Sequence, residues 1–181
     1  MIKKFLIALV ILLWVGVLLS ALWWYNTTYI RTEFFAGQEL QLPQDIAGPG
    51  RIRLVHFWDP SCPCNLGNQQ HLGELTRDYA DSVDFYHVQM PGSNGHLPKT
   101  LNRLKPIKIH VNTDILPASP AVAIWDEFGQ LAYFGPYSEG AICNSSNSFV
   151  EPVLEALKQG RSVLSGSNLA AGCFCTWQPS P

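Results

Sequence analysis

The stretch LVHFWDPSCPC, residues 54–64, decides the fold of this chain, because an apolar run leads directly into two cysteines. Residues 51–58 are mostly apolar, which is typical of a strand buried in a parallel sheet. We expect a turn over residues 59–65 and a helix over residues 66–79, where the apolar positions have a loose helical period. Both cysteines then lie where the helix begins.

This position favours thiol chemistry. The free N–H groups and the positive dipole end of a helix start stabilise a thiolate and lower the pKa of a cysteine held there. A thiolate attacks a disulfide, whereas a thiol does not. Pro63, between the two cysteines, has no N–H group, which is no loss in a first helical turn, and it stiffens the spacer.

The rest of the chain alternates strands and helices before an antiparallel end, which predicts an α/β fold with a central mixed sheet flanked by helices. Ser148 and Glu151 have capping-box spacing before the last helix. The region before residue 51 looks like a stalk with a short edge strand near residues 39–42, and the tail has no periodicity. The other expected elements are strands at 83–89 and 107–112, a short helix at 97–104, hairpin strands at 121–125 and 130–134, and a helix ending at Gln159.

The N-terminus has the pattern of a single transmembrane helix. Phe5 to Trp24 form an apolar run of 20 residues, and a helix of that length spans about 30 Å, the thickness of bilayer hydrocarbon. Lys3 and Lys4 precede the run, so the positive-inside rule places the N-terminus in the cytoplasm. The alternative is a cleaved signal peptide, whose apolar core is shorter, about 7 to 15 residues.

Composition excludes other classes of protein. The net charge is -2, from 12 Lys and Arg against 14 Asp and Glu, so no basic surplus exists to neutralise nucleic-acid phosphates. An apolar content of 47% with six Trp and nine Phe excludes intrinsic disorder. The 181 residues allow one ordinary domain besides the anchor.

The cysteine count is odd. Two pairs, Cys62/Cys64 and Cys173/Cys175, are spaced C-x-C, and Cys143 stands alone. Five choices of unpaired cysteine and three pairings of the rest allow 15 patterns, among which the sequence does not choose. Either N-terminal alternative exports the domain to an oxidising compartment, where disulfides persist.

The motifs place the chain beside a known family. Phe57-Trp58 followed by Cys62-Pro63-Cys64, and Ser119-Pro120 followed by the apolar run 121–124, resemble the thioredoxin-like family over roughly residues 51–160. With its anchor, the chain is similar to membrane-tethered bacterial thiol–disulfide oxidoreductases. The resemblance implies a thioredoxin-like fold that needs no organic cofactor.

The resemblance also implies residue roles. Cys62 would be the attacking cysteine and Cys64 the resolving one. Pro120 would be a cis-proline that faces the dithiol and shapes a substrate groove, to which Ser119 and Trp58 would contribute.

His56 falls where thioredoxins place a buried aspartate beneath the resolving sulfur, and an imidazole with a pKa near 6.5 would accept a proton from Cys64. The alternative is a core histidine that is hydrogen-bonded to its surroundings.

The spacing departs from the family. C-x-C is one residue shorter than C-x-x-C, so a Cys62–Cys64 disulfide would close a smaller, more strained ring and would be more oxidising. The tail pair, Cys173 and Cys175, lies outside the resemblance. We expect it either to form a structural staple with Cys143 or to exchange disulfides with Cys62 and Cys64.

These observations predict an anchor at residues 1–25, a stalk at 26–50, a thioredoxin-like domain at 51–160 and a cysteine-containing tail at 161–181. The predicted function is thiol–disulfide exchange on exported proteins at the periplasmic face of the inner membrane, with an unknown redox partner. The alternatives are a copper-binding or metal-delivery domain, since soft thiolates select Cu(I) or Zn, and a non-catalytic interaction module with structural disulfides.

Overall fold

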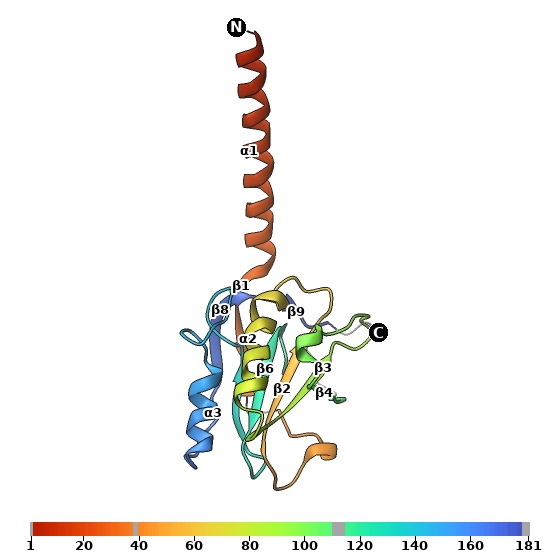
Figure 1. The fold of residues 1–181 in the computed structure, drawn as a ribbon, viewed down its shortest axis with the longest axis vertical. Helices are drawn as coiled ribbons and strands as arrows, with labels where there is room; N and C mark the ends of the chain where they lie inside the picture. Colours follow the sequence, from red (N-terminus) through yellow and green to blue (C-terminus); the bar gives the residue numbers. More distant parts are fainter. Residues whose placement is uncertain (1, 38–39, 110–114, 179–181) are drawn as a thin grey trace.

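A long N-terminal helix projects from a folded domain in this computed structural model, which describes residues 2–37, 40–109 and 115–178 (Figure 1). Helix α1, Ile2–Tyr29, buries none of its residues. Its most apolar window of 18 residues has a mean hydropathy of 2.9. The helix is therefore long and apolar enough to cross a membrane, although signal sequences near an N-terminus share both properties.

The central sheet of the domain has five strands in the order β4-β3-β2-β6-β7. Strands β2 (Ile52–Trp58), β3 (Val83–Gln89) and β4 (Lys105–Pro106) are parallel to one another. Strands β6 (Ala121–Trp125) and β7 (Leu131–Gly135) are an antiparallel hairpin, and β6 pairs antiparallel with β2. All seven residues of β2 are buried, as expected for the central strand of a covered sheet.

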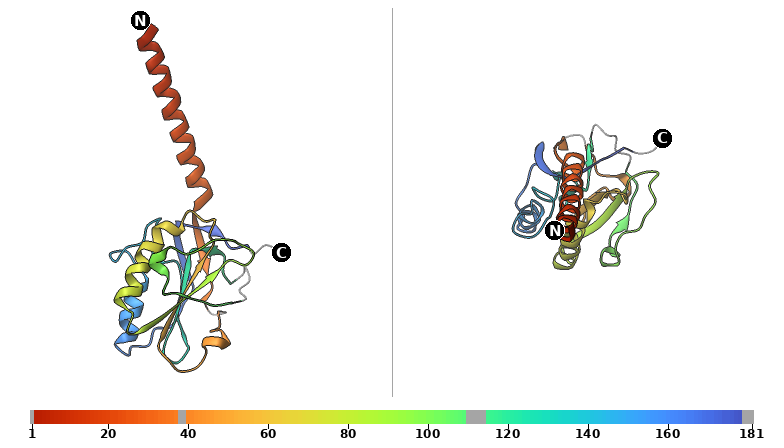
Figure 2. Two further views of the ribbon diagram at one scale, coloured as in Figure 1. Left: turned by 45° about the vertical axis from the view of Figure 1, so that its right-hand side comes forward. Right: turned by 90° about the horizontal axis from the view of Figure 1, so that it is seen from above.

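Two helices cover one face of this sheet. Helix α2, Asn65–Asp78, follows β2 directly, and α3, Val150–Lys158, follows β7 (Figure 2). Their apolar residues pack with those of the sheet in one cluster that includes Leu54, Leu72 and Leu154. A parallel βαβ unit, an antiparallel hairpin and a final helix around a mixed sheet form the predicted thioredoxin-like fold.

The opposite face of the sheet is covered by segments from both ends of the chain. Strand β1, Ile30–Phe35, pairs antiparallel with β8, Asn168–Cys173, and the short strand β5, Ala118–Ser119, pairs with β9, Cys175–Thr176. Figure 1 shows β1, β8 and β9 at the base of α1. The apolar cluster on this face includes three nearly inaccessible aromatic side chains of the stalk and tail: Phe35, Phe174 and Trp177.

Several predicted elements need correction. The tail contains two strands, although its sequence shows no periodicity, because the pairing partners lie far away in the chain. The stalk strand is β1, and residues 40–42 are not a strand, while Glu39 lies outside the described residues. The strand predicted at 107–112 is replaced by β4, which precedes it, and residues 110–112 lie outside the described residues.

The short helix predicted at 97–104 is instead a 3-10 turn, η3, over Lys99–Leu101. A second 3-10 turn, η2, spans Gln44–Ile46. The hydroxyl Oγ of Ser148 accepts a hydrogen bond of 3.1 Å from the Val150 N–H at the start of α3, and the predicted hairpin is confirmed.

Candidate thiol–disulfide site

Cys62 and Cys64 lie at the turn between β2 and α2, as predicted. The Cys62 N–H donates to the Asp59 carbonyl oxygen at 2.9 Å, and the Asn65 N–H donates to the Cys62 carbonyl oxygen at 3.3 Å. The Asp59 carboxylate accepts hydrogen bonds from the N–H and the hydroxyl of Ser61, at 2.9 and 2.7 Å. Cys64 is the residue directly before α2. Both cysteines therefore lie at the N-terminal end of α2, where the helix dipole is positive.

The two cysteines are joined to the tail and not to each other. Cys62 forms a disulfide with Cys175, and Cys64 forms one with Cys173. The strained Cys62–Cys64 ring expected from the spacing is therefore absent, because each sulfur has a partner more than 100 residues away, with sequence separations of 113 and 109. The sulfurs of Cys62, Cys64 and Cys175 all lie within 4.8 Å of one another. The four cysteines form one sulfur cluster, the four-cysteine cluster.

The tail lies against the strand that precedes Pro120. In the β5–β9 ladder, Ser119 pairs with Cys175 and Ala118 with Thr176. The Trp177 N–H donates to the Pro117 carbonyl oxygen at 3.2 Å and extends this contact. The Cys62 sulfur is 3.7 Å from the Ser119 carbonyl oxygen. The structure thus places the Ser119 carbonyl oxygen beside the Cys62 sulfur, and a substrate-binding role for Ser119 stays a prediction.

The Ser119–Pro120 peptide bond is cis. Trp58 is buried, and its indole N–H donates to Nδ1 of His87 at 3.3 Å, a residue of the neighbouring strand. Burial lowers the pKa of this His87, so it accepts the hydrogen bond as a neutral ring. Substrate-groove roles for Pro120 and Trp58 stay predictions.

The tail covers the cysteines. Only 4% of Cys62, 2% of Cys64 and 3% of Cys173 is exposed, whereas Cys175 is half-buried. The sequence did not indicate which sulfur would be exposed. In this oxidised arrangement the least buried of the four bonded cysteines belongs to the tail and not to the helix start.

The end of α1 and the start of β1 hold the tail from the other side. The Tyr25 hydroxyl donates to the Cys173 sulfur at 3.2 Å, and the Phe174 N–H donates to the Tyr29 carbonyl oxygen at 2.8 Å. The Arg31 guanidinium donates to Thr176 Oγ1 at 3.0 Å and to the Phe174 carbonyl oxygen at 3.2 Å, so it bridges the two neighbours of Cys175. None of these four hydrogen bonds is predictable from local sequence, and the only local sign of a buried tail is its two aromatic residues, Phe174 and Trp177.

His56 is fully buried on β2 and is hydrogen-bonded to Tyr137, whereas the predicted proton partner is Cys64. Its Nδ1 lies 2.8 Å from the Tyr137 hydroxyl, and the two rings stack edge-on. Burial, with a smaller contribution from the charge of His87, lowers the pKa of His56 to about 3. Burial also raises the pKa of Tyr137 well above its usual value, so the phenol keeps its proton. The expected pKa near 6.5 is therefore wrong, and His56 is neutral at neutral pH.

Cys143 does not join the tail. It is a buried free thiol, so the staple through Cys143 is not formed, and Cys62 and Cys64 cross-link the tail in its place. The Cys143 N–H donates to the Gly67 carbonyl oxygen at 3.0 Å, and Gly67 has no room for a side chain beside the Ala141 carbonyl oxygen. This close approach holds the loop of Cys143 on the first turns of α2.

The Cys143 thiol faces a buried histidine on α2. His71 Nε2 is 3.1 Å from a Glu151 carboxylate oxygen, and its Nδ1 is 3.4 Å from one of Glu74. A hydrogen bond with Cys143 and the carboxylate of Glu151 raise the pKa of His71 to about 9, against the opposing effect of burial. This group links α2 to α3, and a cavity of about 440 Å³ is lined by His71, Cys143 and Cys64 of the four-cysteine cluster.

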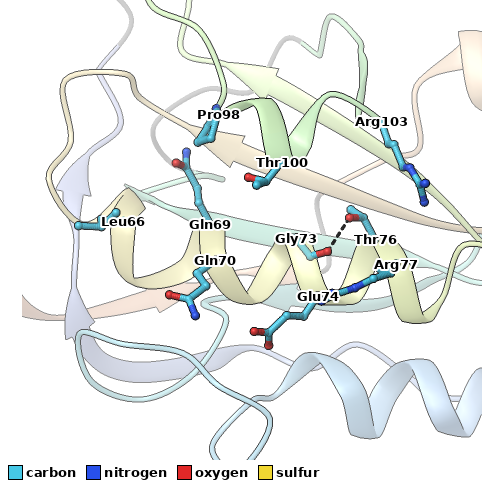
Figure 3. Close-up of a pocket in the computed structure, with 10 residues that line it drawn as sticks. All are labelled: Leu66, Gln69, Gln70, Gly73, Glu74, Thr76, Arg77, Pro98, Thr100 and Arg103. Carbon is cyan, nitrogen blue, oxygen red and sulfur yellow. Dashed lines mark hydrogen bonds between the residues drawn. The ribbon is translucent and has the colours of Figure 1, made fainter.

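A groove of about 550 Å³ lies between α2 and η3 (Figure 3). Most of its lining surface is apolar, and its charged side chains, Glu74, Arg77 and Arg103, are of both signs. None of the residues that line it is a cysteine or a histidine, and within the described residues nothing ties it to thiol chemistry. We therefore place the candidate site at the four-cysteine cluster.

Comparison with known proteins supports the fold and leaves the activity open. A family model described as "Domain of unknown function (DUF6436)" matches residues 31–177, and no curated protein matches the chain. A hypothetical protein from Sinorhizobium meliloti has 15% identity and a TM-score of 0.53, over 84% of this chain and 93% of that one. An uncharacterized conserved protein from Geobacillus kaustophilus has 17% identity and a TM-score of 0.53, over 84% and 94%. A thioredoxin-like protein in its oxidized form has 19% identity and a TM-score of 0.46, over 75% and 98%.

Proposed function

Because this chain belongs to the DUF6436 family and has a thioredoxin-like fold, we propose that it carries out thiol–disulfide exchange on exported proteins through the Cys62-Pro63-Cys64 dithiol. Helix α1 tethers it to the inner membrane, with Lys3 and Lys4 in the cytoplasm and the domain in the periplasm. Residues 51–160 are the exchange domain, and the tail 161–181 is its resident disulfide partner.

One observation carries this proposal. Cys62 is disulfide-bonded to an extended segment that pairs, through β9, with the strand beside the helix start. Adding an extended peptide to an exposed sheet edge is a general mode of peptide recognition, since the backbone hydrogen bonds need no particular side chains. The tail thus occupies the place where an extended substrate would be presented to Cys62.

Cys62 is the reacting cysteine of the dithiol. When its disulfide is attacked, Cys62 leaves as a thiolate, which the N–H groups at the start of α2 stabilise. A substrate dithiol loses two electrons and two protons and becomes a disulfide, while Cys62 and Cys175 become thiols. In the reverse direction the Cys62 thiolate attacks a disulfide sulfur. His56 takes part in this proposal only as a neutral buried ring that is hydrogen-bonded to Tyr137.

The test uses the full chain in membranes and a reduced peptide with two thiols. We expect the peptide to be oxidised stoichiometrically while the protein gains alkylatable thiols at Cys62 and Cys175. Acid quenching and non-reducing electrophoresis should also reveal mixed disulfides with exported proteins. A Cys62→Ser/Cys64→Ser variant should lose both activities, whereas Cys143→Ser, which removes the free thiol alone, should keep them.

The burial of three of the four sulfurs favours the alternative of structural disulfides in a binding scaffold. In that case the native protein leaves the dithiol peptide reduced, and its thiols become reactive only on unfolding. Those two results together would overturn the proposal.

The four-cysteine cluster also favours a second candidate function, binding of a soft metal ion. Because the tail folds back, the sulfurs of Cys62, Cys64 and Cys175 lie within 4.8 Å of one another, close enough to share one Cu(I) or Zn ion once reduced. The test is to reduce the full chain without a chelator, add Cu(I) or Zn, and measure bound metal. One ion per chain that is lost in Cys62→Ser/Cys64→Ser would support this candidate, and no retained metal would exclude it.

A further inference from the structure

We infer that Cys175 in the tail, and not Cys62 at the helix start, is the sulfur that an external thiolate attacks. This rests on the proposed exchange function and names the sulfur that meets the substrate. Cys175 then lies between the substrate and Cys62, and the Cys64–Cys173 bond takes no part in the exchange.

The four bonded cysteines differ in the exposed fraction of each residue. A thiolate must reach the disulfide sulfur that it attacks, so access decides which of the two sulfurs in a bond reacts. Cys62, Cys64 and Cys173 are all at most 4% exposed, whereas Cys175 is half-buried. Its neighbour Thr176 is exposed, and so are Ser61 and Pro63 on either side of Cys62. The Cys62–Cys175 bond is therefore approachable from the side of the tail.

The stability of the leaving thiolate also favours attack at Cys175. Attack at Cys175 expels Cys62, whose thiolate is stabilised at the start of α2, and a low-pKa thiol leaves faster. The Arg31 guanidinium, which is paired with the Glu33 carboxylate at 3.5 Å, bonds to both neighbours of Cys175 and so fixes the backbone and side chain on either side of this sulfur. Attack at Cys62 would instead expel Cys175, which lies on a short strand without a helix dipole.

The tail stays in place after the bond opens. Phe174 and Trp177 flank Cys175 and are 2% and 1% exposed, and Trp177 packs edge-on against Phe57 of β2. Burial of these two large aromatic side chains stabilises the docked segment independently of the Cys62–Cys175 bond. The opened Cys175 therefore remains beside Cys62 and is available to close the bond again.

The exchange balances in two steps. A substrate thiolate attacks the Cys175 sulfur, so the Cys62–Cys175 bond breaks, a substrate–Cys175 disulfide forms and the Cys62 thiolate leaves, with no net oxidation. A second thiolate of the same substrate then attacks its own bonded sulfur and releases the Cys175 thiolate. The substrate has lost two electrons, and Cys62 and Cys175 have gained them and take up two protons.

Two full-chain variants isolate the two disulfides. Cys64→Ser/Cys173→Ser keeps only Cys62–Cys175, and Cys62→Ser/Cys175→Ser keeps only Cys64–Cys173, so each retains one cross-link of nearly equal loop length. The probe is reduced glutathione, added to the oxidised protein in detergent and quenched with acid. We expect the first variant to react at least tenfold faster, with glutathione on Cys175 and a free thiol on Cys62 by peptide mass spectrometry.

The wild-type chain gives the same readout without substitutions, so the test does not depend on the variants folding. Its first adduct should be on Cys175. A first adduct on Cys62 or Cys64, or equal rates for the two variants, would overturn this inference while leaving exchange intact. No adduct on any cysteine of the folded chain would instead overturn the proposed exchange function, and the inference with it.

Discussion

The hydroxyl of Tyr25, in the last turns of α1, donates a hydrogen bond of 3.2 Å to the sulfur of Cys173. Tyr25 follows directly after the apolar run that ends at Trp24, and about 20 helical residues fill the bilayer hydrocarbon. Under the proposed tether, the four-cysteine cluster therefore lies at the membrane surface. Its exchange partners then meet it within the interfacial layer.

Removing this hydroxyl should make the inner disulfide easier to reduce. A hydrogen bond contributes about 0.5–1.5 kcal/mol, so Tyr25→Phe should raise the rate of Cys64–Cys173 reduction by about two- to tenfold. The rate is measured by thiol alkylation in the Cys62→Ser/Cys175→Ser background, where that bond is alone. Tyr29→Phe is the matched control, since Tyr29 contacts the tail through its backbone carbonyl. A larger effect in the control would contradict the assigned contact.

Trp177→Ala should destabilise the domain by about 3–5 kcal/mol, because it removes a fully buried aromatic side chain from the face of the sheet that the tail covers. Urea unfolding of the oxidised protein measures the loss. Gln178→Ala, at the next and exposed position, should change stability by less than about 0.5 kcal/mol. Equal stability of the two variants would mean that the tail is not docked in solution.

The two disulfides should be strongly non-additive in stability. Each closes nearly the same loop, of 113 or 109 residues, and closing a loop of about 100 residues is worth about 4.7 kcal/mol in the chain-entropy model. Losing one bond leaves the loop closed by the other, so each double-serine variant should lose much less than this. The variant with all four serines should lose roughly the full amount. A thermodynamic cycle over these proteins checks the prediction, and simple additivity would contradict it.

Acid should destabilise the fold through His56. Its folded pKa of about 3 lies below the unfolded value of 6.5, so below pH 6.5 the unfolded chain binds more protons and stability falls until pH 3. Between pH 6.5 and 4.5 this amounts to about 2–3 kcal/mol. His56→Gln should flatten this part of the stability curve. An unchanged slope in that variant would assign the acid sensitivity elsewhere.

His71 should lower the stability of the fold at alkaline pH, whereas His56 lowers it at acidic pH. Its folded pKa of about 9 lies above 6.5, so its contribution is fully present below pH 6.5 and is lost as the pH rises through 9. Cys143→Ala and Glu151→Gln remove the two groups that raise this pKa, and both should weaken the loss of stability between pH 6.5 and 9. Chemical unfolding at several pH values measures it, with Glu127→Gln as an exposed control.

The core of the fold could be predicted from local sequence. The strand–turn–helix unit around Cys62, strand β3 and the hairpin after Pro120 each have a period or turn signal within about ten residues. Tail strands β8 and β9 have no such signal, since they are ordered by pairing with β1 and β5. The pKa of His56 was mispredicted for the same reason, because its burial depends on residues remote in the chain.

Local sequence is enough to predict the α/β fold, the apolar N-terminal helix and the place of two cysteines at a helix start, because these features depend on neighbours in the chain. The bonds from Cys62 to Cys175 and from Cys64 to Cys173 depend instead on how distant segments pack. Fifteen pairings satisfy the spacing of five cysteines, and a disulfide requires two sulfurs to meet in space. The burial of Phe174 and Trp177 against the sheet places the sulfurs of Cys173 and Cys175 within bonding distance of Cys64 and Cys62.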